Sequence, residues 1–530
     1  MACTTILVGR KATYDGSTMV ARNEDSPSGE FHPKKLAVRE PQDQGETYTS
    51  VLSKVTIPLP KNPVRYTYMP EAVHGHGLWG AFGVNAYNVS MTATETITSN
   101  PRVLAADPLV EYVPEDPAKG TPEQVGGIGE EDMVNITLPY IKTAREGVSL
   151  LGSYLEKYGT YEMNGIAFQD ENEIWWLETI GGHHWMAVRV PDDCYVVMPN
   201  QLGIDMFNFD DAEADQEFCM GSKDLRAFVE RNHLDLTYVD EDDDEDEDEE
   251  DQAFNARLAF GSRTDSDHVY NTPRSWVVDR HLATKELKFE GFLSDISPED
   301  DDIPWLMIPR RKITVDDIKY VLSNHYQGTP YDVYSKCSDP RLKGKYRAIG
   351  INRNNVLGLV QIRPYVPTPL KAIQWIALGS NVFNAMLPVY AQVSEVPAYL
   401  GEVGEKPSTD NLYWTSRLIG AMADPHFAET ASAIERYQTK VDCRTMQYLH
   451  DFDQAYIKDI MGIEEVEDSF PTIDPESTKE ANTQAEVGTF LAKANQEIVD
   501  FVEKETIACL DQVLYTASSL MKNAFSRSDA

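Results

Sequence analysis

Cys3 is the earliest residue of the sequence whose side chain could act as a nucleophile. A thiol attacks as its thiolate, and free cysteine titrates near pH ~8.5, so it needs a base or a cation beside it. If Cys3 were the first residue of the mature chain, its own α-amine, with an ordinary pKa of about 7.7–8.0, would be that base. Such an amine could take the thiol proton and return it to a leaving amine without a histidine. A chain that begins at Cys3 could therefore attack a carbonyl group that carries an amine leaving group.

Two further residues of suitable type, Arg22 and Asp25, are brought near Cys3 by the expected local structure. Residues 3–9 are β-branched and apolar, Asp-Gly-Ser at 15–17 predicts a turn, and the next stretch predicts a second strand that ends at Asp25. The two ends of a hairpin opposite its turn lie side by side. Arg22 could then stabilise the thiolate, and Asp25 could accept hydrogen bonds from the amine and orient it. On spacing alone, the alternative is a small buried cysteine beside a solvated strand edge.

The sequence carries no recognisable metal or cofactor motif. Its eleven histidines form no HExxH motif, and its six cysteines form no CxxC pair. The densest histidine clusters are His-Gly-His at 74–76 and the pair His183–His184, and two adjacent residues of a strand point to opposite faces. Phosphate-binding, dinucleotide-binding and Gly-x-Ser-x-Gly motifs are also missing. We therefore expect no metal and no cofactor.

The charge of the chain excludes several classes of partner. The formal net charge is -39, and Asp240 to Asp251 form an unbroken run of twelve acidic residues. Because the rest of the chain still carries about -27, the acidity is general. A surface this negative repels phosphate backbones and anionic lipids, so we expect neither nucleic acid nor a membrane as partner. The acidic run predicts a solvated surface loop, and a calcium-binding or partner-binding tail is the alternative.

The cellular location is predicted from what the sequence lacks. Residues 1–30 have no basic start followed by an apolar core, so we expect no signal peptide. No apolar run approaches about 18 residues, so we expect no transmembrane helix. Scattered cysteines in such a chain are typical of reduced thiols, which indicates a cytoplasmic protein.

Hydrophobic periodicity predicts strands, then helices, then strands, and finally a helical end. Two strands are expected within 77–98, and two helices within 130–158, with a break near Glu146–Gly147. Further strands are expected at 165–170, 173–179, 184–191, 194–200, 347–354 and 356–365, the last two separated by an Asn-Asn turn. Beyond about residue 405 the apolar residues recur at helical spacing. This order predicts layers of sheet with helices outside, and the helical end could complete the core or form an oligomer face.

Residues 3–26 resemble the start of the C69 family of cysteine dipeptidases known from lactic acid bacteria, which are N-terminal-nucleophile hydrolases. The resemblance continues in the same order over most of the chain, through residues 80–96, 173–193, 196–204, 265–276, 325–332 and 362–365. A more distant similarity is to penicillin V acylase and bile salt hydrolase, which share a terminal cysteine followed by Arg-Asn-x-Asp. Residues 22–25, Arg-Asn-Glu-Asp, match that pattern.

The resemblance implies a fold and a domain arrangement. The fold would be α+β, a four-layer αββα sandwich of the N-terminal-nucleophile type with the nucleophile on an inner strand. The hydrolase core would cover residues 1–404, with the acidic loop 240–251 outside the scaffold. Residues 405–530 would form a mainly helical C-terminal extension.

The resemblance also implies roles for particular residues. Cys3 would be the nucleophile, with its freed amine as base, and Arg22 and Asp25 would position it. Asn200 resembles the asparagine that follows a strand and helps to form the site in the acylase relatives. Arg274 resembles a second active-site arginine of those relatives.

The chain departs from the acylase pattern at Thr94-Glu95, where those relatives carry an asparagine. A carboxylate would not stabilise an oxyanion, so the oxyanion-hole donors stay unassigned. Glu95 could instead bind the free ammonium group of a substrate. A dipeptidase needs such a contact, and an N-acyl amidase does not.

Taken together, the sequence predicts a metal-independent, cytoplasmic cysteine dipeptidase that acts on small peptides through an acyl-enzyme and forms a homo-oligomer. The first alternative is the same chemistry on N-acylated small molecules, which would show as turnover of substrates without a free amine. The second is a non-catalytic interaction protein on the same scaffold, as among secernin-like relatives. The presence of Cys3, Arg22 and Asp25 argues against the second alternative.

Overall fold

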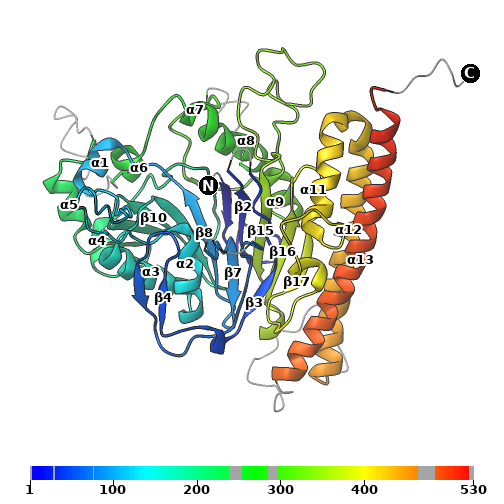
Figure 1. Ribbon diagram of the computed structural model, residues 1–530, viewed down its shortest axis with the longest axis horizontal. Coiled ribbons are helices and arrows are strands. Elements are labelled where there is room, and N and C mark those ends of the chain that lie inside the picture. The colour runs from blue at the N-terminus through cyan, green and yellow to red at the C-terminus, as the bar shows by residue number, and fades with distance from the viewer. Residues whose placement is uncertain are drawn as a thin grey trace, which may run out of the picture.

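The computed structural model describes residues 3–27, 30–73, 75, 77–237, 254–283, 296–463 and 484–523. The chain has an α+β fold in which two large antiparallel sheets are combined with helices (Figure 1). The acidic run 240–251, His74 and His76 lie outside the described residues.

The N-terminal hairpin forms the centre of a seven-stranded sheet. In spatial order its strands are β14 (Leu306–Met307), β12 (Tyr195–Met198), β1 (Cys3–Val8), β2 (Thr18–Asp25), β15 (Asn354–Ile362), β16 (Ala372–Leu378) and β17 (Leu387–Tyr390). The turn predicted at 15–17 is present, and Gly16 has a φ of 83° there, a conformation that favours glycine. Because every residue of β1 and β2 is buried, this hairpin lies inside the molecule.

A second sheet has eight strands drawn mainly from the first half of the chain. In order these are β13 (Cys219–Gly221), β11 (His184–Arg189), β10 (Ile174–Ile180), β9 (Asn164–Gln169), β8 (Ser90–Thr96), β7 (Phe82–Asn85), β6 (Tyr66–Tyr68) and β3 (Ala37–Arg39). A small separate hairpin is formed by β4 (Thr47–Thr49) and β5 (Thr56–Pro58). The strands predicted within 77–98 and between 165 and 200 are confirmed, with slightly different ends.

The two large sheets pack against each other at the hairpin, where β1 contacts β8 and β2 contacts β9. The contact is so close that Gly358 of β15 has no room for a side chain. A Cβ atom at this position would lie 1.9 Å from the ring of Phe82 in β7. The face of the hairpin that carries Cys3 therefore looks toward the second sheet.

Helices from the first half of the chain cover the outer face of the eight-stranded sheet. Helix α3 (Ala144–Tyr158) packs on β9, β10 and β11, and α2 (Glu130–Thr137) packs on β8 (Figure 1). Shorter helices lie in the connections: α1 (Pro101–Ala106), α4 (Phe209–Glu213), α5 (Leu225–Arg231), α6 (Ala256–Phe260), α7 (Asp267–Tyr270) and α10 (Ala398–Gly401).

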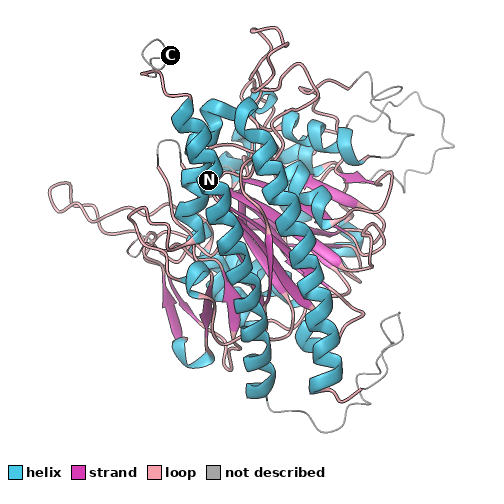
Figure 2. Ribbon diagram, turned by 90° about the vertical axis from the view of Figure 1, so that its right-hand side faces the viewer, coloured by secondary structure: helices cyan, strands magenta, loops and turns pink. Residues whose placement is uncertain are grey.

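The helices predicted beyond residue 405 cover the seven-stranded sheet. Helix α11 (Leu412–Ala423) packs on β16, and the long helices α12 (Phe427–Ala455) and α13 (Gln484–Ser519) pack on β17 and on each other (Figure 2). Helices α8 (Thr272–Leu282) and α9 (Val315–Leu322) share the same apolar core. The domain boundary at 404/405 remains a prediction.

Three details of the predicted helices, turns and strands are wrong. Gly147 does not interrupt the helices but lies inside α3, where its missing side chain lets the ring of Phe168 approach. The interruption falls instead at Leu138–Tyr140, a short 3-10 helix that contains Pro139. The Asn-Asn pair at 354–355 is not a turn, because it lies in β15 with a bulge, and the preceding residues 347–353 form no strand.

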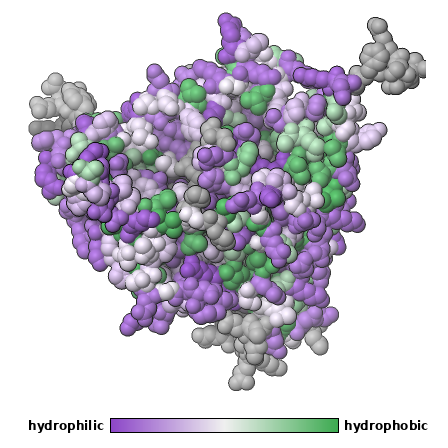
Figure 3. All heavy atoms as spheres, in the orientation of Figure 1, coloured by the Kyte–Doolittle hydropathy of each residue, from purple (hydrophilic) through white to green (hydrophobic). Residues whose placement is uncertain are grey.

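The face of the molecule shown in Figure 3 is mostly hydrophilic, in keeping with the charge of the chain. Within the described ranges, no helix combines the length and the apolar character needed to cross a membrane.

Candidate active site

The strand pairing brings Cys3 and Arg22 together on one buried face. Cys3 lies opposite Glu24, and Thr5 lies opposite Arg22, so these side chains share one side of the hairpin. The Arg22 Nη2 atom donates a hydrogen bond of 3.0 Å to Cys3 Sγ. The hairpin thus places Arg22 at the thiol of Cys3, and its role in stabilising the thiolate remains a prediction.

Arg22 belongs to a chain of buried charges. Its guanidinium donates to Glu24 at 3.0 Å and to Glu130 at 2.6 Å. Glu24 also lies 2.6 Å from the ammonium group of Lys34, which donates to the carbonyl of Trp79. None of the four charged side chains is more than 1% exposed, and buried charges are tolerated when they are paired in this way.

The nitrogen of Cys3 has a different environment from its thiol. It donates to Asn200 Oδ1 at 3.2 Å, and the amide of Asn200 donates to the carbonyl of Thr96 at 2.9 Å. Arg274, fully buried in the first turn of α8, donates to the same Asn200 oxygen at 2.8 Å. Arg274 also donates to the carbonyl of Cys3 and to Thr4. The fold thus brings Asn200 and Arg274, from distant parts of the sequence, to the nitrogen and carbonyl of Cys3.

Asp25 is close to this group but makes other contacts. Its carboxylate accepts hydrogen bonds from Arg347 and, at 2.5 Å, from Asn354. The hydrogen bond described for the nitrogen of Cys3 goes to Asn200. The predicted role of Asp25 in orienting the amine therefore remains a prediction.

Glu95 reaches the hairpin from the opposite sheet. Its Oε2 atom accepts a hydrogen bond of 2.8 Å from Thr5, and its Oε1 atom has no hydrogen-bond partner among the described residues. Burial raises the pKa of this carboxyl group to about 8, although Arg274 and Arg22 oppose the shift. Glu95 therefore sits beside the thiol with one oxygen atom available for a further donor.

The protonation of Cys3 depends on these surroundings. Burial raises the pKa of the Cys3 thiol above its usual value, Arg22 lowers it, and the carboxylates of Glu95 and Glu130 raise it again. A second positive charge would favour the thiolate. In the chain with Met1 and Ala2 attached, the nitrogen of Cys3 is a peptide amide and cannot supply one.

The sequence analysis missed three participants, namely Glu130, Lys34 and Arg347. Glu130 begins the acidic triplet Glu130-Glu131-Asp132 at the N-terminus of α2, where carboxylates are favoured by the helix dipole. This acidic triplet at the start of a helix is the feature of the sequence that could have identified Glu130. Lys34 lies in a stretch without a pattern, and Arg347 begins a stretch that was expected to form a strand. The contacts of both could be recognised only in the folded chain.

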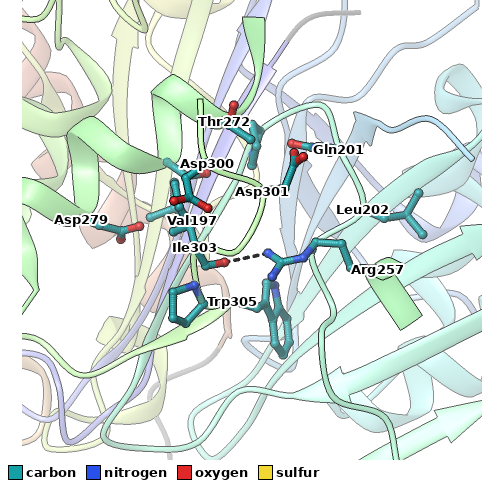
Figure 4. A pocket seen from close by; sticks show the side chains of 14 residues that line it. Val197, Gln201, Leu202, Arg257, Thr272, Asp279, Asp300, Asp301, Ile303 and Trp305 are labelled. Carbon is teal, nitrogen blue, oxygen red and sulfur yellow. Dashed lines mark hydrogen bonds between the residues drawn. The ribbon is translucent and has the colours of Figure 1, made fainter. Parts of the chain in front are cut away.

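A pocket of about 320 Å³ opens beside Asn200 and is lined by residues of the β8 end, of the 262–266 loop and of α7. Figure 4 shows a second cavity, of about 30 Å³, which is also lined by residues of the 197–203 segment and where Arg257 donates to the carbonyl of Ile303. The second cavity has room for water only and includes none of the expected site residues. The larger pocket is therefore the candidate for substrate.

The histidine pair differs from the expectation. His183 lies in the turn before β11, and the Nδ1 atoms of His183 and His184 both contact the carboxylate of Asp107, at 3.1 and 2.8 Å. The argument that the two rings must point apart is therefore wrong. Across the residues that the structure describes, no group of three or more His, Cys, Asp or Glu side chains is arranged to hold a metal ion.

Comparison with known proteins defines the class. The model of peptidase family C69 matches residues 2–440. A "Dipeptidase" of Bifidobacterium longum is 50% identical over the whole of both chains. A "Probable dipeptidase A" of Streptococcus pyogenes is 46% identical, also over the whole of both chains. "Dipeptidase A" of Lactobacillus helveticus is 39% identical over 98% of this chain and 97% of its own. The chain belongs to peptidase family C69.

Proposed function

We propose that this chain is a cysteine-type dipeptidase in which Cys3, as the first residue of the mature protein, is the nucleophile. The observation that carries the proposal is the environment of Cys3, with Arg22 at 3.0 Å from its thiol and Asn200 at 3.2 Å from its nitrogen. The full-length similarity to relatives named dipeptidase supports the substrate class.

The reaction would proceed in two stages. The α-amine of Cys3 takes the thiol proton, and the thiolate, stabilised by Arg22, forms a bond to the peptide carbonyl carbon. When the carbon–nitrogen bond breaks, the ammonium group of Cys3 gives its proton to the leaving amino acid. Water then attacks the acyl-enzyme, its proton passes to the same amine, and the carbon–sulfur bond breaks. No metal takes part in this scheme.

The site residues would divide the work as follows. Asn200 and Arg274 hold the backbone of Cys3, and Asp25 orients the site through Arg347 and Asn354. The Oε1 atom of Glu95, which has no partner among the described residues, would accept a hydrogen bond from the ammonium group of the substrate. This contact would favour free dipeptides over N-acylated substrates.

The proposal includes the fold type. The two large sheets would form the inner layers, and the helices that cover each of them would form the outer layers. Together they would make the four-layer αββα sandwich of N-terminal-nucleophile hydrolases. We further propose a hydrolase core over 1–404, a helical extension over 405–530, a cytoplasmic location and a homo-oligomer.

A substrate panel tests the proposal. The purified protein would be given free dipeptides, tripeptides and N-acylated amides, with and without EDTA. Hydrolysis of dipeptides alone, unchanged by EDTA, is expected. Preferred turnover of N-acylated amides would favour the acylase alternative, and loss of activity in EDTA that zinc restores would contradict the cysteine mechanism.

A further inference from the structure

The pocket beside Asn200 has an unusual lining. Five of its residues carry hydroxyl groups on short side chains: Thr96, Thr98, Ser262, Thr264 and Ser266. We call it the hydroxyl pocket. The hydroxyl group of Ser262 is buried and has no hydrogen-bond partner among the described residues. A buried polar group without a partner is unfavourable, so a site of this kind is suited to a ligand that hydrogen-bonds.

The hydroxyl pocket is fixed to the nucleophile by one side chain. The Nη2 atom of Arg274 donates to Asn200 Oδ1 and to Asn271 Oδ1, both at 2.8 Å, and both asparagines line the pocket. The Nη1 atom of the same guanidinium donates to the carbonyl of Cys3. The pocket and Cys3 therefore keep a fixed relative position.

The two sides of Cys3 differ in charge, and this difference orients a bound dipeptide. The thiol side faces Glu130, which is paired with Arg22, and Glu95, whose Oε1 atom has no hydrogen-bond partner among the described residues and suits the ammonium end of a substrate. The nitrogen side faces Asn200 and the hydroxyl pocket. Because the nitrogen of Cys3 must deliver a proton to the leaving amine, the leaving amino acid has to lie on the nitrogen side.

We propose that the hydroxyl pocket binds the leaving, carboxyl-terminal amino acid of the dipeptide and selects neutral polar side chains there. This inference rests on the proposed function and adds the specificity of one subsite to it. Both halves of the substrate are then assigned: the amino-terminal residue lies toward Glu95 and Glu130, and the carboxyl-terminal residue lies toward Ser262.

The lining explains the selection. Asp267 is the charged residue of the lining, and its carboxylate is already occupied by Asn271 at 2.6 Å and by Thr264 at 2.9 Å. Because the leaving residue already brings its own α-carboxylate, an acidic side chain would add a second negative charge near Asp267 and is disfavoured by repulsion. An apolar side chain would displace water from the hydroxyl groups without replacing its hydrogen bonds, which lowers affinity. Hydroxyl and amide side chains carry no charge and can replace the hydrogen bonds of the displaced water, so neither unfavourable effect applies to them.

Two matched variants test the proposal. Ser262→Ala removes the unpaired hydroxyl group inside the pocket. Ser99→Ala removes a hydroxyl group that is also buried and without a partner among the described residues, but Ser99 does not line the pocket. The two positions are close, since Ser99 pairs with Gly261, the neighbour of Ser262. Each variant would be assayed for kcat/KM on Ala-Ser, Ala-Leu and Ala-Glu, and on the reversed series Ser-Ala, Leu-Ala and Glu-Ala.

The wild type should prefer Ala-Ser to Ala-Leu and Ala-Glu by about tenfold or more. Ser262→Ala should reduce this preference by about fivefold and leave the reversed series unchanged, whereas Ser99→Ala should change neither. Thr98→Leu, at the exposed rim, should slow substrates with large leaving residues only. Equal changes in both series, or the same change in Ser99→Ala, would overturn the assignment while leaving the dipeptidase activity established. A wild type that hydrolyses no dipeptide would overturn the proposed function itself.

Discussion

Lys34 and Glu24 form an ion pair of 2.6 Å in which neither side chain is more than 1% exposed. This ion pair affects the nucleophile through Arg22. The guanidinium of Arg22 contacts the thiol of Cys3 and also two carboxylates, those of Glu24 and Glu130. Two carboxylates in contact with one arginine compensate its positive charge, which weakens the attraction between that arginine and a thiolate. Lys34 neutralises one of them, so Arg22 can stabilise the thiolate of Cys3.

Replacing Lys34 should therefore weaken the nucleophile. In Lys34→Met, Glu24 keeps its charge and competes with the thiolate for Arg22. The midpoint of the rate of Cys3 alkylation against pH should rise by about one pH unit. Lys34→Arg should restore the profile, because it keeps the positive charge. Iodoacetamide labelling of Cys3, followed by mass spectrometry at several pH values, measures the midpoint.

A double variant separates this electrostatic effect from a loss of structure. Glu24→Gln combined with Lys34→Met removes both charges, so the alkylation midpoint should return toward that of the wild type. Lys319→Met serves as control, because the ammonium group of Lys319 donates instead to Ser323 and to the carbonyl of Asn381. If the double variant shifted as far as Lys34→Met alone, Lys34 would not act through Glu24.

Replacement of the nucleophile gives the next prediction. Cys3→Ala should lower kcat by more than about a thousandfold, because the thiolate attack has no substitute. Alanine fits the buried strand position, so the melting temperature should stay within about 4 °C of the wild type. Dipeptide hydrolysis and thermal unfolding measure the two quantities. Residual activity within tenfold of the wild type would contradict the role of Cys3.

Glu95→Gln tests the ammonium contact. A substrate ammonium group beside Glu95 lowers the pKa of that carboxyl group and favours the carboxylate, which holds the ammonium group better than a neutral amide does. KM for free dipeptides should therefore rise by about tenfold. KM for the same peptides with a blocked amino group should change little. Initial rates on the two matched substrate series measure the difference. Equal effects on both would exclude Glu95 from substrate binding.

The same carboxyl group should affect stability as pH changes. Burial raises the pKa of Glu95 from 4.5 to about 8, so the folded chain binds a proton that the unfolded chain releases. Its contribution to stability is complete below pH 4.5 and is lost as pH rises through about 8. Between these values Glu95→Gln should make the free energy of unfolding fall less steeply, by at most about 1.4 kcal/mol per pH unit.

Urea unfolding at intervals from pH 5 to about 8 measures this slope. The exposed residue Glu46 offers a control, since Glu46→Gln should leave the slope as it is. Parallel curves for Glu95→Gln and the wild type would show that the carboxyl group is already ionised in the folded chain.

Part of this site could be predicted from the sequence because its geometry is local. The pairing of Cys3 with Glu24, and hence the position of Arg22, follows from two short strands and one turn. Asn200 and Arg274 were identified only through the family resemblance, since no local pattern links them to residue 3. Their contacts depend on how β12 and α8 pack around the hairpin.

The remaining parts depend on the close approach of layers. Glu130 reaches Arg22 across 108 positions of sequence, from a helix that covers the opposite sheet. Gly147 resembled a helix break, but its role is to let Phe168 pack against α3. A sequence pattern shows which residues are apolar or charged, whereas these contacts depend on the distance between two sheets and their helices.

Processing at the N-terminus is the last prediction. If the α-amine of Cys3 is the base, Met1 and Ala2 must both be absent from active protein, because a peptide nitrogen has no usable lone pair. Removal of Met1 is expected, since the alanine beside it is small. Removal of Ala2 could come from the Cys3 thiol acting on the adjacent Ala2 carbonyl or from another aminopeptidase. Intact mass and N-terminal sequencing should show chains that begin at Cys3.

Engineered starts make the same prediction independent of how Ala2 is removed. A chain encoded as Met-Cys should be active after loss of methionine alone, and a chain encoded as Met-Pro-Cys should stay inactive. The activity of the first should rise with pH through a pKa of about 7 to 8, the range of an α-amine. A homogeneous, fully active preparation that still begins with Ala2 would refute the N-terminal nucleophile, because the nitrogen beside the thiol would then be an amide without basicity.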